Sequence, residues 1–168
     1  MQTFFVLDAA FPIIAKGMSL DHPDGITRLR YIVHRLRAPG GCPWDMEQTH
    51  ESLIPHVIEE AYEVVDAIKS GNAELICEEL GDLLLQPVLH AEIASGRGDF
   101  DLDQMAHGLS EKLIRRHPHV FGDDEARSAT LAKGFWEERK AEERKDKPTQ
   151  GTLAGIPVAL PGLTRAVK

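Results

Sequence analysis

The sequence has few cysteines and no long apolar run. Cys42 and Cys77 lie far apart and form no C-x-x-C pair, so we expect free thiols in a reducing compartment rather than a disulfide. No stretch approaches the roughly 20 apolar residues that span a bilayer. The most apolar segment, residues 4–15, has no basic residue before it, unlike a signal peptide. These absences predict a cytoplasmic protein that crosses no membrane.

Positive charge is also scarce. The 168-residue chain has a formal net charge of −8, which argues against nucleic-acid binding because such binding needs a cationic surface. About half of the acidic residues lie between positions 51 and 103, where the only basic residues are Lys69 and Arg97. An anionic ligand could approach this region only if cations covered it. The charge distribution therefore indicates metal binding.

The spacing of apolar residues predicts an all-α protein, because it follows the helical period and nowhere alternates as in a strand. Residues 38–45, rich in Gly and Pro, are expected to form a loop. Ser52 is the expected N-cap of the helix that follows, and the third helix should end before Gly96. We expect helices at about residues 25–36, 53–69, 73–94, 102–116 and 130–145.

Two acidic residues of the third predicted helix lie on an apolar face. Glu79 and Asp82 share a strip with Gln86 that is bordered by leucines, whereas the other acidic residues of this helix occupy the natural solvent side. Two unpaired anions buried there would cost several kcal/mol. Either a cation binds at this strip, or a basic residue pairs with both carboxylates.

The second predicted helix repeats this i, i+3 spacing with Glu60 and Glu63. If the two helices pack antiparallel, as their short connection favours, four carboxylates can converge. Oxygen ligands without His or Cys are typical of Mg²⁺ or Mn²⁺ rather than zinc. The alternatives are a solvated acidic face and a buried cluster of ion pairs, and the lack of nearby Lys or Arg argues against the second.

These acidic residues resemble a family signature. Glu59-Glu60-x-x-Glu63 followed by Glu79-x-x-Asp82 resembles the E-E-x-x-E…E-x-x-D signature of the MazG family of nucleoside triphosphate pyrophosphohydrolases. Similar segments surround it, at residues 41–45 (GCPWD), 48–50 (QTH), 78–83 (EELGDL) and 115–121 (RRHPHVF), so the resemblance covers about residues 20–168. It implies an antiparallel α-helical bundle completed by dimerisation and release of pyrophosphate from nucleoside triphosphates, with Mg²⁺ held by Glu60, Glu63, Glu79 and Asp82.

Further residues are candidates for contact with such a substrate. Lys112 shares a helix face with Arg115 and with Arg116, and either pair could clamp phosphate oxygens; the alternative is that they complement the dipole at a helix C-terminus. The similarity to the family's basic run favours phosphate contact. Trp44 could stack on a base while Asp45 accepts hydrogen bonds from it, or Trp44 could pack as an apolar plug.

Glu59 is the candidate general base, which would accept a proton from a metal-activated water. Three other functions compete with this one. A di-iron oxidoreductase would need a Glu-x-x-His on each of two helices, and the chain has one, at residues 47–50. A regulatory or interaction module would hold a purely structural ion. A phosphoribosyl-ATP pyrophosphohydrolase is usually shorter and lacks the Cys-Pro-Trp-Asp segment.

The expected organisation is one catalytic helical domain at residues 19–147. Residues 1–18 would be an N-terminal extension, either disordered or upstream of a true start at Met18, and residues 148–168 an apolar tail or connector. Many family members carry two such modules, so the chain is either a short form or a piece. Pro87 also departs from the family's pattern and should kink the third helix one turn past Asp82.

Overall fold

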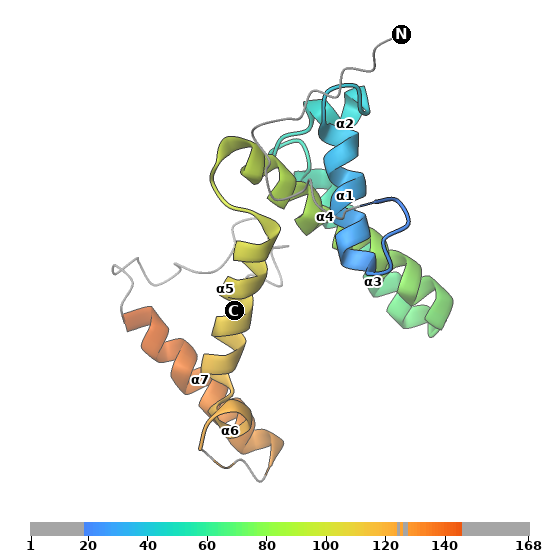
Figure 1. Cartoon of the computed structure of the whole chain (residues 1–168). Helices are drawn as coiled ribbons and strands as arrows, with labels where there is room; N and C mark the ends of the chain where they lie inside the picture. The colour runs from blue at the N-terminus through green and yellow to red at the C-terminus, as the bar shows by residue number, and fades with distance from the viewer. Residues whose placement is uncertain (1–18, 124, 126–127, 146–168) are drawn as a thin grey trace. The chain divides into compact units, whose positions relative to one another are not determined.

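The computed structural model describes residues 19–123, 125 and 128–145, and every regular element in these ranges is helical (Figure 1). The all-α class is therefore confirmed. None of the described helices is both long and apolar enough to cross a membrane. The predicted extension and tail lie outside the described residues. The helices are α1 (Gly25–Arg37), α2 (Pro43–Glu47), α3 (Ile54–Ser70), α4 (Ala73–Arg97), α5 (Leu102–Arg116), α6 (Pro118–Phe121) and α7 (Ala129–Lys145).

The chain divides into two compact units, Met1–His107 and Gly108–Lys168, and the boundary falls within α5. The first unit contains α1 to α4 and the first turns of α5. The second contains the rest of α5 together with α6 and α7.

Helices α3 and α4 form a tight hairpin, and they pack against each other more extensively than any other pair of elements (Figure 1). Gly71 ends α3 with a φ of 71°, a left-handed conformation that glycine adopts without steric cost. Asn72 begins α4, because its side chain accepts a hydrogen bond from the backbone N–H of Glu74 at 2.9 Å. The link therefore turns the chain back at once, which makes α3 and α4 antiparallel.

The apolar core of the first unit lies around the second half of α4. It contains Val33 of α1, Leu53 just before α3, and three residues of α4, namely Val88, Leu89 and Ile93. Val33 is fully buried and Leu53 is 1% exposed. Beside this core, His34 of α1 contacts Glu92 of α4 at 2.9 Å. The first half of α4 contributes no residue to the core cluster.

Three predicted boundaries were wrong. Residues 38–45 are not all loop, because α2 begins at Pro43, whose fixed φ suits the first position of a helix. The N-cap of α3 is Leu53; Ser52 instead accepts a hydrogen bond from the backbone N–H of Thr49 at 2.9 Å, within the preceding turn. The third helix runs through Gly96 to Arg97, and it ends only where Gly98 adopts a φ of 74°.

Pro87 lies inside α4, which runs unbroken for 25 residues. Proline has no backbone N–H, so it cannot donate to the carbonyl of Leu83 one turn earlier. The helix is held on both sides of this position, since Gln86 and Val88 are buried. The kink itself stays a prediction.

Candidate active site

Three of the predicted carboxylates meet between α3 and α4. Glu60, Glu79 and Asp82 each offer an oxygen, and these oxygens lie within 4.8 Å of one another. Glu60 and Glu79 are half-buried, whereas Asp82 is exposed. The i, i+3 spacing on α4 and the antiparallel packing of the hairpin thus bring together three of the four carboxylates that the sequence predicted to converge.

Glu63, the fourth predicted ligand, is exposed and lies one turn along α3 from Glu60. It is not part of the three-oxygen group. Its charge nevertheless acts on that group, because it raises the pKa of both Glu60 and Glu79. A fourth carboxylate therefore stands at the edge of the cluster.

The cluster carries negative charge that nothing in the described part of the chain offsets. Burial raises the pKa of Glu60, and repulsion from the neighbouring carboxylates raises it further. Burial raises the pKa of Glu79 as well, and the charges of Glu63, Asp82 and Glu78 raise it further. Oε2 of Glu60 is buried and has no hydrogen-bond partner among the described residues. None of the ion pairs in the described ranges involves Glu60, Glu63, Glu79 or Asp82.

The polar strip of α4 continues inward from Asp82 to Gln86, one turn later. Gln86 is 5% exposed, and its Oε1 has no partner within the residues that the structure describes. A buried amide without a hydrogen bond is unfavourable. The strip therefore combines exposed charge at Asp82 with buried, unsatisfied polarity beneath it, which is typical of a ligand-binding position.

Glu59, the candidate general base, lies outside the three-oxygen group. Its side chain is 64% exposed, and Oε2 lies 3.8 Å from Nδ1 of His56. It contributes to the raised pKa of Glu60, which indicates proximity to the cluster. Glu59 is exposed and lies beside the three-oxygen group, and its role as proton acceptor stays a prediction.

The segment that contains Pro43 and Trp44 is held at the end of α1 by hydrogen bonds. Arg37 donates hydrogen bonds to the backbone carbonyls of Asp45 and Gln48. A Cβ at Gly41 would lie 2.3 Å from the carbonyl oxygen of Leu36, so no other residue fits there without a backbone shift. The segment therefore positions Asp45, which is half-buried, through backbone contacts.

Trp44 is not a buried plug, because it is 52% exposed. Its ring contacts His56 of α3 edge-on, with the ring centroids 5.8 Å apart. The alternative of tight packing is thereby weakened, and a largely open aromatic surface remains for a base to stack on. His56 also contacts Glu59, so it lies between Trp44 and the candidate base.

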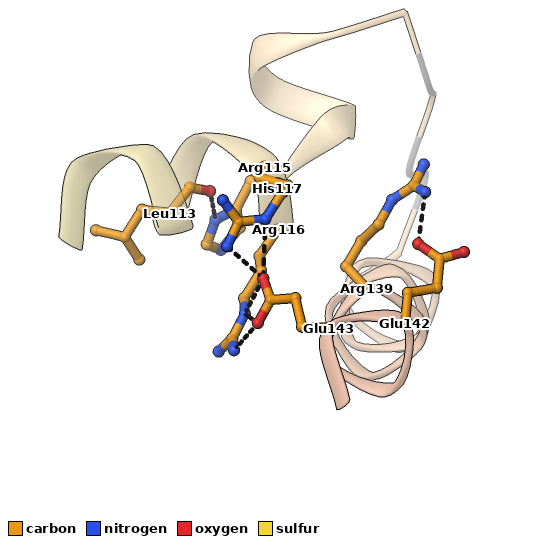
Figure 2. A network of polar contacts seen from close by, with 7 residues as sticks. All are labelled: Leu113, Arg115, Arg116, His117, Arg139, Glu142 and Glu143. Carbon is orange, nitrogen blue, oxygen red and sulfur yellow. Dashed lines mark hydrogen bonds and ion pairs between the residues drawn. The ribbon is translucent and has the colours of Figure 1, made fainter. Parts of the chain in front are cut away.

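The predicted basic residues belong to the second unit. Lys112 is exposed. Arg115 and Arg116 both donate hydrogen bonds to Glu143 of α7, as Figure 2 shows. Sequence reasoning missed Glu143, because α7 is rich in charged residues of both signs and one glutamate among them carries no distinguishing signal.

The sequence matches a known family from the end of α2 to the end of α6. The family model of the MazG nucleotide pyrophosphohydrolase domain matches residues 48–121. A solved structure, the mazG-related protein from Thermotoga maritima, is 32% identical, with a TM-score of 0.57 over 68% of this chain and 97% of that one. The chain belongs to the MazG family.

Curated proteins named nucleoside triphosphate pyrophosphohydrolase are also similar. The nucleoside triphosphate pyrophosphohydrolase of Escherichia coli K12 is 46% identical over 85% of this chain. The nucleoside triphosphate pyrophosphohydrolase/pyrophosphatase MazG of Thermotoga maritima is 48% identical over 80% of it. The chain spans 55% of the first relative's length and 51% of the second's.

We expect divalent cations to stabilise the protein through this cluster. The raised pKa of Glu60 and of Glu79 means that the folded state holds their protons more tightly than the unfolded state. In EDTA, the contribution of these two carboxyls to stability should therefore be fully present below the ordinary glutamate pKa of 4.5 and should be lost as pH rises through the raised values. Mg²⁺ at neutral pH should raise Tm by several degrees.

Thermal unfolding followed by circular dichroism would measure both effects. Glu60→Gln should flatten the fall with pH and remove most of the Mg²⁺ response. Asp66→Asn is the matched control, because Asp66 is an exposed acid on α3 that pairs with Lys69. If Mg²⁺ raised the Tm of wild type and of Glu60→Gln equally, the cluster would not be the site at which the cation binds.

Proposed function

We propose that the protein hydrolyses nucleoside triphosphates to a nucleoside monophosphate and pyrophosphate, in a reaction that depends on Mg²⁺. The observation that carries this proposal is the uncompensated group of carboxylate oxygens from Glu60, Glu79 and Asp82. The names of the Escherichia coli and Thermotoga maritima relatives support the choice of substrate and products. Removal of aberrant or excess nucleotides would be a role consistent with this activity.

The residues present fit a hard divalent cation. The group offers only oxygen ligands, and the buried Oε2 of Glu60 lacks the partner that a cation would supply. Glu60, Glu63, Glu79 and Asp82 would hold Mg²⁺, and Mn²⁺ could replace it because it prefers the same ligands. When bound, the ion would neutralise phosphate charge and lower the pKa of a coordinated water.

The chain's own side chains would perform the remaining steps. Glu59 would accept the proton of the water whose oxygen bonds to phosphorus as the bond to pyrophosphate breaks. Its side chain is 64% exposed and is therefore accessible to water. Trp44 would stack on the base and Asp45 would accept hydrogen bonds from it. Positive side chains would contact the triphosphate oxygens, namely Lys112, Arg115 and Arg116.

Incubation with each common NTP and dNTP plus Mg²⁺ tests the activity. Ion-exchange chromatography should detect a monophosphate and pyrophosphate in equal amounts, and the rates should rank the bases. EDTA should abolish turnover, and Glu60→Ala should lower kcat/KM at least about 100-fold because charge neutralisation is lost. A folded protein that binds Mg²⁺ but turns over none of these substrates would instead be a binding module.

Glu59→Gln tests the proposed proton acceptor. The substitution keeps the size of the side chain but removes its basicity, so kcat should fall about 100-fold while KM changes little. The Mg²⁺-induced rise in Tm should persist, which separates this role from metal binding. If Glu59→Gln keeps the wild-type kcat, the proton must be accepted by a group other than Glu59.

We further propose that the protein is a homodimer. Apolar side chains of α3 at helical spacing remain between 42% and 57% exposed, namely Ile54, Ile58, Tyr62, Val65 and Ile68. On α4, Leu80 is 48% exposed and Leu84 40%. A contiguous apolar surface of this kind is typical of protein interfaces, and a second copy would cover it.

Multi-angle light scattering tests the dimer. The wild-type mass should be twice that of the chain at micromolar concentration, and Ile58→Asp should shift it towards the monomer because a charge would be buried in the interface. Leu131→Asp is the control, since Leu131 is 52% exposed on α7, outside this surface. A wild-type protein that stays monomeric across the concentration range would refute the proposal.

A further inference from the structure

Arg115 and Arg116 are consecutive residues at the end of α5, yet both guanidinium groups contact the same carboxylate. Consecutive side chains leave an α-helix about 100° apart and do not normally face each other. Figure 2 shows that both guanidinium groups turn towards the carboxylate of Glu143, which comes from α7. One acidic side chain from another helix thus gathers two cations that the helix alone would separate.

The hydrogen bonds leave part of each guanidinium open. Arg115 donates to Oε1 of Glu143 from Nε at 2.9 Å and from Nη2 at 2.6 Å. Arg116 donates to Oε2 from Nε at 3.2 Å and from Nη2 as well. Glu143 therefore occupies the Nε–Nη2 edge of both groups. Neither Nη1 has a hydrogen-bond partner among the described residues, and the Nη1–Nη2 edge can bind a phosphate in bidentate fashion.

The two arginines differ in access. The side chain of Arg116 is 14% exposed, and its guanidinium lies 4.8 Å from the centroid of the Trp136 ring. The side chain of Arg115 is 52% exposed, and it lines a cavity of about 450 Å³ together with Ile114 and Phe121. Arg116 is consequently an anchored cation, and Arg115 is the accessible one.

We propose that Glu143 is a positioning residue for the triphosphate: it holds Arg115 and Arg116 as one cationic pair, and the exposed Arg115 presents its open Nη1–Nη2 edge to phosphate oxygens. This inference rests on the proposed function. The pair and Glu143 together carry one net positive charge. An arginine already held in place loses little rotamer freedom when the anion binds, which favours affinity.

A purely electrostatic view predicts the opposite effect of Glu143. Its negative charge would repel phosphate, and its removal would raise the local charge and tighten binding. Without it, however, two like charges on neighbouring side chains would repel each other and separate. The two views differ in the sign of one measurable quantity, the change in KM when Glu143 becomes neutral.

Steady-state kinetics of pyrophosphate release would test the proposal. Glu143→Gln should raise KM about tenfold while kcat stays within about twofold of wild type, because the phosphate contact is loosened but the reacting groups are unchanged. Glu142→Gln is the matched control. Glu142 is the preceding residue and lines the same cavity, but it pairs at 3.0 Å with Arg139 instead (Figure 2). Its substitution removes the same negative charge from the cavity without releasing Arg115 or Arg116, so KM should not rise.

An unchanged or lowered KM in folded Glu143→Gln would overturn the proposal. If Glu143→Gln does not fold, Arg115→Gln, which keeps the contact between Arg116 and Glu143, must show the same rise, and a wild-type KM would refute it. If wild type hydrolyses no nucleotide, the proposed function fails, but calorimetric titration with inorganic tripolyphosphate still tests the inference. Weaker binding by Glu143→Gln would then support it, and equal or absent binding would refute it.

Discussion

Repulsion among carboxylates between α3 and α4 is the constraint on which the first unit depends. The tight turn at Gly71 and Asn72 sets the register in which the two helices meet, and that register brings three carboxylate oxygens within 4.8 Å of one another. Packing elsewhere must offset this unfavourable contact. The apolar core around Val33 and Leu53 lies against the second half of α4 and provides that packing. Functional sites commonly break local rules in this way, at the expense of stability.

Helix α4 carries both the carboxylates that repel each other and the apolar residues that stabilise the core. Its first half carries Glu79 and Asp82, and its second half carries the buried residues Val88 and Leu89. Pro87 lies where the two halves meet. Because the helix is continuous, the core holds the carboxylates in place although they repel each other, and the structure gains a site that a cation would stabilise.

In the second unit, opposite charges attract each other instead of like charges repelling. One carboxylate, Glu143, gathers the cations of Arg115 and Arg116, and these hydrogen bonds lower the pKa of Glu143 to about 2. The carboxylate is therefore charged throughout the physiological range. The first unit thus carries a cluster of anions, and the second carries a pair of cations held by one anion.

The sequence by itself determined the helical class, most helix positions and the pairing of acids on α3 and α4, because these follow from the fixed period of the helix and from local caps such as Asn72. It could not determine the start of α2, the exposure of Trp44 or the contacts of Glu143 with Arg115 and Arg116. Arg115 and Glu143 are 28 positions apart, and Glu60 and Glu79 are brought together only by the hairpin. Such contacts depend on how helices pack, for which no local pattern exists, so only the tertiary structure decided them.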